Sequence, residues 1–204
     1  MAKQTPKTLQ EKIKDQLLTR FCKKVADVQF SFSYAQFESQ GEMTAINNFG
    51  PEPVEVLVTP WFNDYWFYIL ILFRSEKKIK IEPFVSISFF QKIDNELKQL
   101  FRAEWDSYSE NEGYNHPQPH WHFTAHLSDK TSFSDLEDIE EEGEYNQLLG
   151  NSKTIKLDSM HFAMLGNWTS EGNMLNENGE TCLVDWMIQL FRHVREELLY
   201  KDRK

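Results

Sequence analysis

The chain has 204 residues, of which 40% are hydrophobic and 14% aromatic, so it can bury a sizeable core without staples. Acidic residues outnumber basic ones by 32 to 22, and the net charge of −10 argues against a protein that coats nucleic acid by bulk charge. A local basic patch for nucleic acid is compatible with this balance. The two cysteines, Cys22 and Cys182, lie too far apart in sequence for a disulfide framework, which favours a reducing, cytoplasmic compartment.

The apolar segments argue against secretion and against a membrane span. Residues 1–14 contain no apolar stretch typical of a signal peptide. The most apolar run, residues 65–73, is far shorter than the roughly 20 residues that cross a bilayer as a helix. Its length is typical of a buried strand. We therefore expect a cytoplasmic protein without a membrane-spanning segment.

The first half of the chain reads as one helix followed by strands. Apolar residues recur every three or four positions over residues 8–27, which predicts an amphipathic helix. Strand-like patterns and turn residues then predict strands at residues 28–34, 43–46, 54–59, 65–73 and 79–90. Charged and glycine-containing turns between them indicate an antiparallel meander.

Helical spacing returns over residues 93–106 and predicts a central helix that covers one face of the sheet. Residues 128–148 carry eight acids and one lysine, which is typical of an exposed acidic segment and also suits docking to a basic partner. Short strands are expected at residues 154–157 and 160–165, and apolar spacing over residues 183–198 predicts a long closing helix.

Together these elements predict one α+β domain over residues 1–204, because no linker is long enough to divide the chain. We expect an antiparallel sheet of about 5–7 strands packed against the N-terminal, central and C-terminal helices. No Gly-rich phosphate loop, Walker motif or Rossmann fingerprint occurs in the sequence, which argues against nucleotide-driven work.

The histidines are concentrated in one short segment. Four of the six lie within residues 116–126, namely His116, His120, His122 and His126. If the chain from residue 120 is extended, His120 and His122 point to one side and Trp121 and Phe123 to the other. We expect the aromatic side to face the core and the imidazoles to face solvent. Same-side Cβ atoms lie about 6.5–7 Å apart, which lets His120 and His122 share a metal ion or a phosphate.

Three other histidines have weaker or conditional roles. Pro117 and Pro119 stiffen the chain beside His116 and present it from a rigid lip. His126 lies about 13 Å from His122 along an ideal strand, too far to join the same metal. His193 lies on the closing helix beside two arginines, as expected of a surface residue.

His161 lies in the strand predicted at residues 160–165. Pairing of this strand with the one that carries His120 and His122 would give a three-histidine site with an open position for water, as catalytic zinc requires. The metal-ligand hypothesis is therefore His120, His122 and His161, with zinc or manganese as the ion. Carboxylates that could replace one histidine are Asp106, Glu110, Glu112 and Asp129.

Two alternatives to a metal site stay open at this point. The candidate catalytic residues of a metal or phosphate site are His116, His120 and His122, and in a metal-free phosphodiester reaction a histidine pair would serve as acid and base. The cation that holds the phosphate would then be Lys130, Arg102 or Arg74. Alternatively, the histidines form only a structural polar network.

The histidine segment resembles three groups of proteins. His120, His122 and Thr124 are similar to the motif of the histidine-triad nucleotide hydrolases, with threonine in place of their third histidine. His122, Phe123 and Thr124 resemble one half of the paired signature of the two-histidine phosphoesterases, whose second copy is missing here.

The broader resemblance covers roughly the second half of the chain. Residues 116–122, the strand with His161 and the closing helix with Trp186 are similar to small uncharacterised bacterial proteins marked by His-Pro-x-x-His-x-His. Some of those are encoded beside toxin-antitoxin, mobile-element or antiphage genes, so this resemblance implies a biological context without a mechanism.

The residues and the resemblance together predict a bacterial cytoplasmic protein with a histidine-lined site for metal or phosphate, used as a toxin-like or defence-associated hydrolase or nuclease. The alternative is a non-enzymatic subunit of an antiphage or toxin-antitoxin assembly, with structural histidines. Either function implies a protein partner.

Overall fold

The computed structural model describes residues 8–25, 27–49, 52–76, 80–106, 119–123, 162–163 and 179–201. Three consecutive pieces form the N-terminal helix: α1 (Leu9–Gln16), the π-helix η1 (Leu17–Phe21) and α2 (Cys22–Lys24). A capping box starts it, because the Thr8 hydroxyl accepts from the Glu11 N–H and the Glu11 carboxylate accepts from the Thr8 N–H. The C-terminal helix is α5 (Gly179–Lys201). Both predicted terminal helices are confirmed.

The described strands form one antiparallel sheet with a side branch. They are β1 (Gln29–Phe32), β2 (Gln36–Gln40), β3 (Met43–Asn47), β4 (Val54–Phe62), β5 (Tyr65–Glu76), β6 (Lys80–Ile93), β7 (Glu96–Asp106), β8 (His120–Phe123) and β9 (Phe162–Ala163). Their order is β1-β2-β5-β6-β7-β8-β9, with β4 paired to β5 and β3 joined through β4. The α+β class with an antiparallel sheet is confirmed, although nine strands exceed the expected five to seven.

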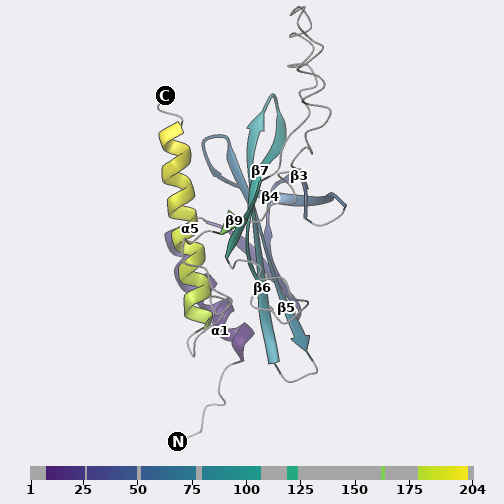
Figure 1. The fold of residues 1–204 in the computed structure, drawn as a ribbon, viewed down its shortest axis with the longest axis vertical. Helices are drawn as coiled ribbons and strands as arrows, with labels where there is room; N and C mark the ends of the chain where they lie inside the picture. The colour runs from purple at the N-terminus through teal and green to yellow at the C-terminus, as the bar shows by residue number, and fades with distance from the viewer. Residues whose placement is uncertain are drawn as a thin grey trace, which may run out of the picture.

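The helices cover one face of the sheet, which we call the helix face (Figure 1). Alternate residues of the central strands point toward α1 and α5 and are almost fully buried, among them Phe67, Ile69, Val85, Ile87 and Phe89. Tight packing of aromatic and branched side chains between sheet and helices is the expected core of this class of fold.

The β3–β4 hairpin lies on the opposite face, which we call the hairpin face (Figure 1). Its buried residues Ala45, Val56 and Val58 form a second, smaller cluster with Tyr68 and Phe90 of the sheet. β4 links the two parts, because its first half pairs with β3 and its second half pairs with β5. The hairpin face also carries polar residues, and the candidate site lies on this face.

The predicted central helix is wrong: residues 96–106 form strand β7. Asp94 and Asn95 both have positive φ angles, as a two-residue hairpin turn requires, and they pair Ile93 with Glu96. Further along, Phe89 and Phe90 of β6 face Phe101 and Gln99 of β7, so Leu100 is an extra residue in a β-bulge.

This bulge explains why the sequence mimics a helix. It shifts the two-residue period by one position, so the apolar residues fall at Leu97, Leu100, Phe101 and Trp105. These are helical intervals, although Leu97 packs in the hairpin-face cluster and the other three pack in the helix-face core. The same shift turns Arg102 and Glu104 to the hairpin face.

The first half of the chain contains the predicted strands and one more. The additional strand is β2, which was missed.

The Cys22 side chain is half-buried, and this burial raises the pKa of its thiol, as expected of an inert cysteine. The acidic segment 128–148 and the strand predicted at residues 154–157 lie outside the described residues. No helix in the described ranges is long and apolar enough to cross a membrane.

A substitution in the core tests the packing of α5 on the sheet. The Phe191 ring lies 5.0–5.2 Å from the ring centres of Phe21, Phe67, Phe89 and Trp61. Phe191→Ala should lower the free energy of unfolding by about 3–5 kcal/mol in urea titrations, because it leaves a cavity among these rings. Tyr200→Ala on the same helix is the control, since Tyr200 is 58% exposed, and its effect should stay within about 0.5 kcal/mol. Equal effects would contradict this packing.

Candidate metal centre

The pairing of β7 with β8 brings four polar side chains together on the hairpin face. Glu104 lies directly opposite His120, and Arg102 lies directly opposite His122. Because side chains alternate along a strand, these four share one face, and Trp121 points to the other. Trp121 packs against the helix-face core, beside Phe101.

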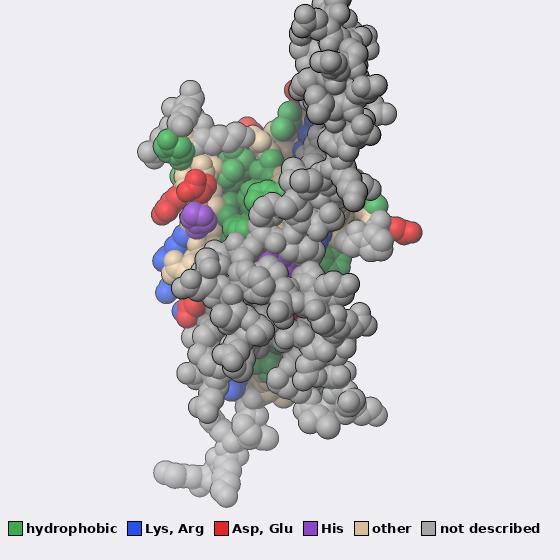
Figure 2. All heavy atoms as spheres, viewed as in Figure 1, with side chains coloured by type: hydrophobic (Ala, Val, Ile, Leu, Met, Phe, Trp, Pro, Cys, Tyr) green, Lys and Arg blue, Asp and Glu red, His purple; other side chains and the backbone are tan. Residues whose placement is uncertain are grey.

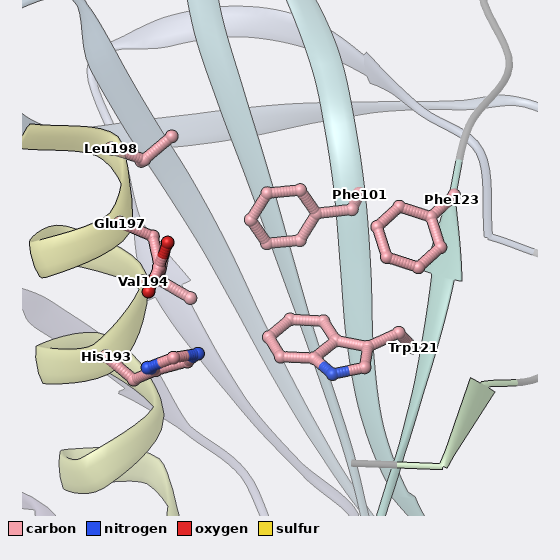
Figure 3. Close-up of a pocket in the computed structure, with 7 residues that line it drawn as sticks. All are labelled: Phe101, Trp121, Phe123, His193, Val194, Glu197 and Leu198. Carbon is pink, nitrogen blue, oxygen red and sulfur yellow. The ribbon is translucent and has the colours of Figure 1, made fainter. Parts of the chain in front are cut away.

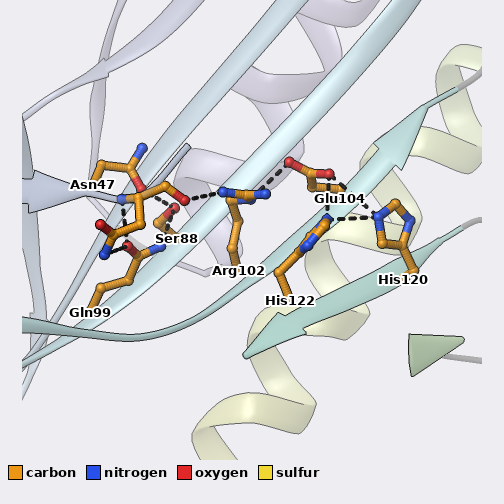
Figure 4. Close-up of polar contacts among 8 residues, drawn as sticks. Asn47, Ser88, Gln99, Arg102, Glu104, His120 and His122 are labelled. Carbon is orange, nitrogen blue, oxygen red and sulfur yellow. Dashed lines mark hydrogen bonds and ion pairs between the residues drawn. The ribbon is translucent and has the colours of Figure 1, made fainter. Parts of the chain in front are cut away.

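Three atoms converge at the centre of this group (Figure 4). Nε2 of His122 lies 2.8 Å from Nε2 of His120 and 2.8 Å from Oε2 of Glu104. Nε2 of His120 lies 3.4 Å from the same carboxylate oxygen. A neutral imidazole has one N–H, which can point well at only one acceptor. Hydrogen bonds alone therefore account poorly for a triangle in which each atom approaches both others.

The same triangle can take a metal ion with a small spread of the ligands, because a 2.8 Å separation subtends about 84° at an ion about 2.1 Å away and has to open toward the tetrahedral angle. Three atoms with these separations leave a point about 2.1 Å from each of them, roughly 1 Å out of their plane. That is the usual distance from zinc to imidazole nitrogen or carboxylate oxygen. Glu104, His120 and His122 form a group of ligand atoms that can hold a metal. Two histidines and one carboxylate are an established ligand set for catalytic zinc and for non-haem iron.

The side chains of this group are largely buried, which strengthens the electrostatic interactions among them. The side chains of His120, Glu104 and His122 are only 3%, 10% and 13% exposed. Burial by itself would raise the pKa of Glu104, but the hydrogen bonds with His120 and His122 and the charge of Arg102 outweigh it, so the pKa lies well below its usual range. Glu104 is therefore an ionised carboxylate aimed at the two imidazoles.

This geometry favours a cation over a phosphate. An anion near the two Nε2 atoms would lie against Oε2 of Glu104, whereas a cation meets three lone pairs. The two arginines proposed to hold a phosphate each pair with a carboxylate instead. Arg102 pairs with Glu104 at 2.8 Å, and Arg74 pairs with Asp106 at 3.0 Å. Lys130 lies outside the described residues.

The predicted histidine pair is confirmed in one respect and wrong in another. His120 and His122 do share a face and converge, but this face is buried, with His120 only 2% exposed. Both edges of β8 are paired at His120, with β7 on one side and β9 on the other. The pairing of β8 with β9, which the three-histidine hypothesis needs, is present. His116 and His161 themselves lie outside the described residues, and their roles stay predictions.

The carboxylate of the centre was missed in the sequence. Glu104 stands in the segment interpreted as a helix, whereas Asp106 was considered and instead contacts Arg74. The other three carboxylates considered, Glu110, Glu112 and Asp129, lie outside the described residues. A strand interpretation of residues 96–106 would have put Arg102 and Glu104 on one face, but the position of Glu104 opposite His120 depends on the register between β7 and β8. His193 is exposed on α5, as expected.

A second feature near β8 is an apolar groove on the helix face (Figure 3). The aromatic rings of Phe101, Trp121 and Phe123 line its sheet side, and His193, Val194, Glu197 and Leu198 of α5 line the other. Hydrophobic side chains are visible between α5 and the sheet in the space-filling view (Figure 2). The groove is separated from the metal centre by the sheet itself, since Trp121 and His122 point in opposite directions.

Comparisons with family models, curated proteins and solved structures found no match to this chain. The resemblance to the bacterial His-Pro-x-x-His-x-His proteins therefore stays a prediction.

The low pKa of Glu104 predicts how acid affects stability in the presence of a chelator. A carboxylate whose pKa is lower in the folded state stabilises the fold above its unfolded pKa of about 4.3, and this contribution is lost as the pH falls. Between pH 5 and pH 3, where the histidines of the unfolded chain are already protonated, the native chain should lose about 1–2 kcal/mol more than Glu104→Gln, as measured by urea unfolding. Glu96→Gln, an exposed position on β7, should follow the native chain. Parallel curves for all three proteins would contradict the ionised carboxylate.

Proposed function

We propose that this chain binds a divalent metal ion through Glu104, His120 and His122 and acts as a metal-dependent hydrolase. The observation that carries the proposal is the triangle formed by the two Nε2 atoms and Oε2, with sides of 2.8, 2.8 and 3.4 Å. Zinc suits two imidazoles and one carboxylate well, iron(II) shares this ligand set, and manganese is the alternative ion expected from the sequence.

Three protein ligands leave at least one coordination position for water. A zinc ion held by Glu104, His120 and His122 would supply a water whose pKa is lowered to about 7, the usual source of a hydroxide nucleophile in such sites. The substrate class we propose is a phosphodiester, in agreement with a nuclease. Because the chain has a net charge of −10, contact with nucleic acid would have to be local rather than through bulk charge.

Burial favours a second candidate function. With the His120 side chain 3% exposed and that of Glu104 10% exposed, the ligands suit a structural centre that stabilises the attachment of β8 to β7. The protein would then be a non-enzymatic subunit of an assembly. The two candidates differ in whether a substrate can reach the metal.

The biological setting is proposed from the sequence resemblance alone. It implies a bacterial protein of the cytoplasm that acts with a protein partner in an antiphage or toxin-antitoxin system. This setting is compatible with either candidate function.

Metal analysis of protein purified without a histidine tag tests the proposal. We expect about one equivalent of zinc or manganese per chain, and a more than tenfold loss of affinity in His120→Ala, His122→Ala and Glu104→Gln. His193→Ala is the matched control, because this histidine is exposed on α5 and should bind metal normally.

Hydrolysis of bis(p-nitrophenyl) phosphate by the same proteins then separates the two functions. Activity that needs metal and disappears in the three ligand variants supports the hydrolase. Stoichiometric metal without hydrolysis of this or of nucleic-acid substrates would instead support the structural centre. Native protein that takes up no divalent ion would contradict the metal centre.

A further inference from the structure

The two oxygens of Glu104 have different neighbours. Oε2 faces the imidazoles of His120 and His122, whereas Oε1 lies 2.8 Å from Nε of Arg102 (Figure 4). A metal at the centre of the triangle therefore meets only Oε2. Bidentate binding by Glu104 would require Oε1 to leave its partner.

Arg102 is itself fixed at several points. Its Nη1 donates to the backbone carbonyl of Asn48, and its guanidinium carbon lies 5.2 Å from the ring centre of Phe49. The side chain is only 10% exposed. The guanidinium thus makes an ion pair with a carboxylate and a hydrogen bond to a carbonyl, and a lysine could not reproduce both contacts.

A hydrogen-bond chain fixes the carbonyl that Arg102 contacts (Figure 4). The backbone N–H and side-chain amide of Asn48 donate to Oε1 of Gln99 at 2.7 and 3.1 Å. Gln99 donates to the Ser88 hydroxyl at 3.3 Å, and that hydroxyl donates to Oδ1 of Asn47 at 2.7 Å. The segment after β3 is thereby fastened to β6 and β7, and Arg102 with it.

We infer that Arg102 determines which metal the centre prefers, by holding Glu104 to one oxygen and by cancelling its charge. This inference rests on the proposed metal centre. With Arg102 and Glu104 neutralising each other, a cation is held mainly by dative bonds from His120 and His122. Zinc gains much from imidazole ligands, whereas Mn²⁺, Mg²⁺ and Ca²⁺ depend more on charged and bidentate oxygen ligands. The ion pair of Arg102 with Glu104 thus favours zinc over the harder cations Mn²⁺, Mg²⁺ and Ca²⁺.

The test compares the dissociation constants of Zn²⁺ and Mn²⁺, each measured by competition with a chelating dye. In Arg102→Met, Glu104 regains a free oxygen and an uncompensated charge, so the ratio Kd(Mn²⁺)/Kd(Zn²⁺) should fall at least about tenfold. Arg102→Lys keeps the charge and loses the double contact, and the ratio should fall about threefold. Arg74→Met is the matched control, since Arg74 pairs with Asp106 and is 45% exposed, and it should keep the native ratio.

The outcomes distinguish this inference from the proposed function. Native protein that binds neither Zn²⁺ nor Mn²⁺ would overturn the metal centre and this inference with it. Native protein that binds Zn²⁺, with an unchanged ratio in folded Arg102→Met and Arg102→Lys, would overturn the role of Arg102 alone. If Arg102→Met does not fold, the ratio in Arg102→Lys decides the question.

Discussion

The buried charge of Glu104 is the constraint on which the arrangement of the site depends. A carboxylate with a side chain only 10% exposed would be strongly destabilising without partners, because removing an ion from water costs several kcal/mol. Arg102 contacts one of its oxygens and His122 contacts the other. Since these partners belong to β7 and β8, the requirement to compensate one charge favours the observed register between the two strands, as does the packing of Trp121 in the helix-face core.

The β-bulge at Leu100 is what makes this arrangement compatible with the core. It moves the residues that follow it to the opposite phase, so Ala103 and Trp105 enter the helix-face core while Arg102 and Glu104 face the hairpin side. Without the extra residue, the phase of β7 before the bulge would put the charged pair against α5. A local irregularity of the backbone thus separates an apolar face from a charged one along a single strand.

The sequence predicts part of this site because strand alternation is local information. His120 and His122 are two residues apart beside Trp121 and Phe123, and that spacing alone places the imidazoles together. Glu104 could not be predicted in the same way, because the bulge gives the surrounding apolar residues a helical spacing. The turn residues Asp94 and Asn95 were the signal for a hairpin that the periodicity obscured.

The internal position of β8 could not be predicted either, and the reason is long-range. It depends on β9 pairing with one edge of β8 and on β7 pairing with the other, neither of which is visible in the pattern around His120. The same holds for the network after β3, where Asn48 meets Arg102 across 54 positions of sequence. The fold class and the terminal helices follow from periodicity, whereas the closure of the site follows from contacts between distant segments.

The most direct test of the account is an anomalous diffraction map from crystals of the native chain grown with zinc and measured on both sides of the zinc absorption edge. A metal centre formed by these residues should give one strong peak about 2.0–2.2 Å from Nε2 of His120, Nε2 of His122 and Oε2 of Glu104. A map with no peak at these three atoms, or with zinc bound only by other residues, would contradict it.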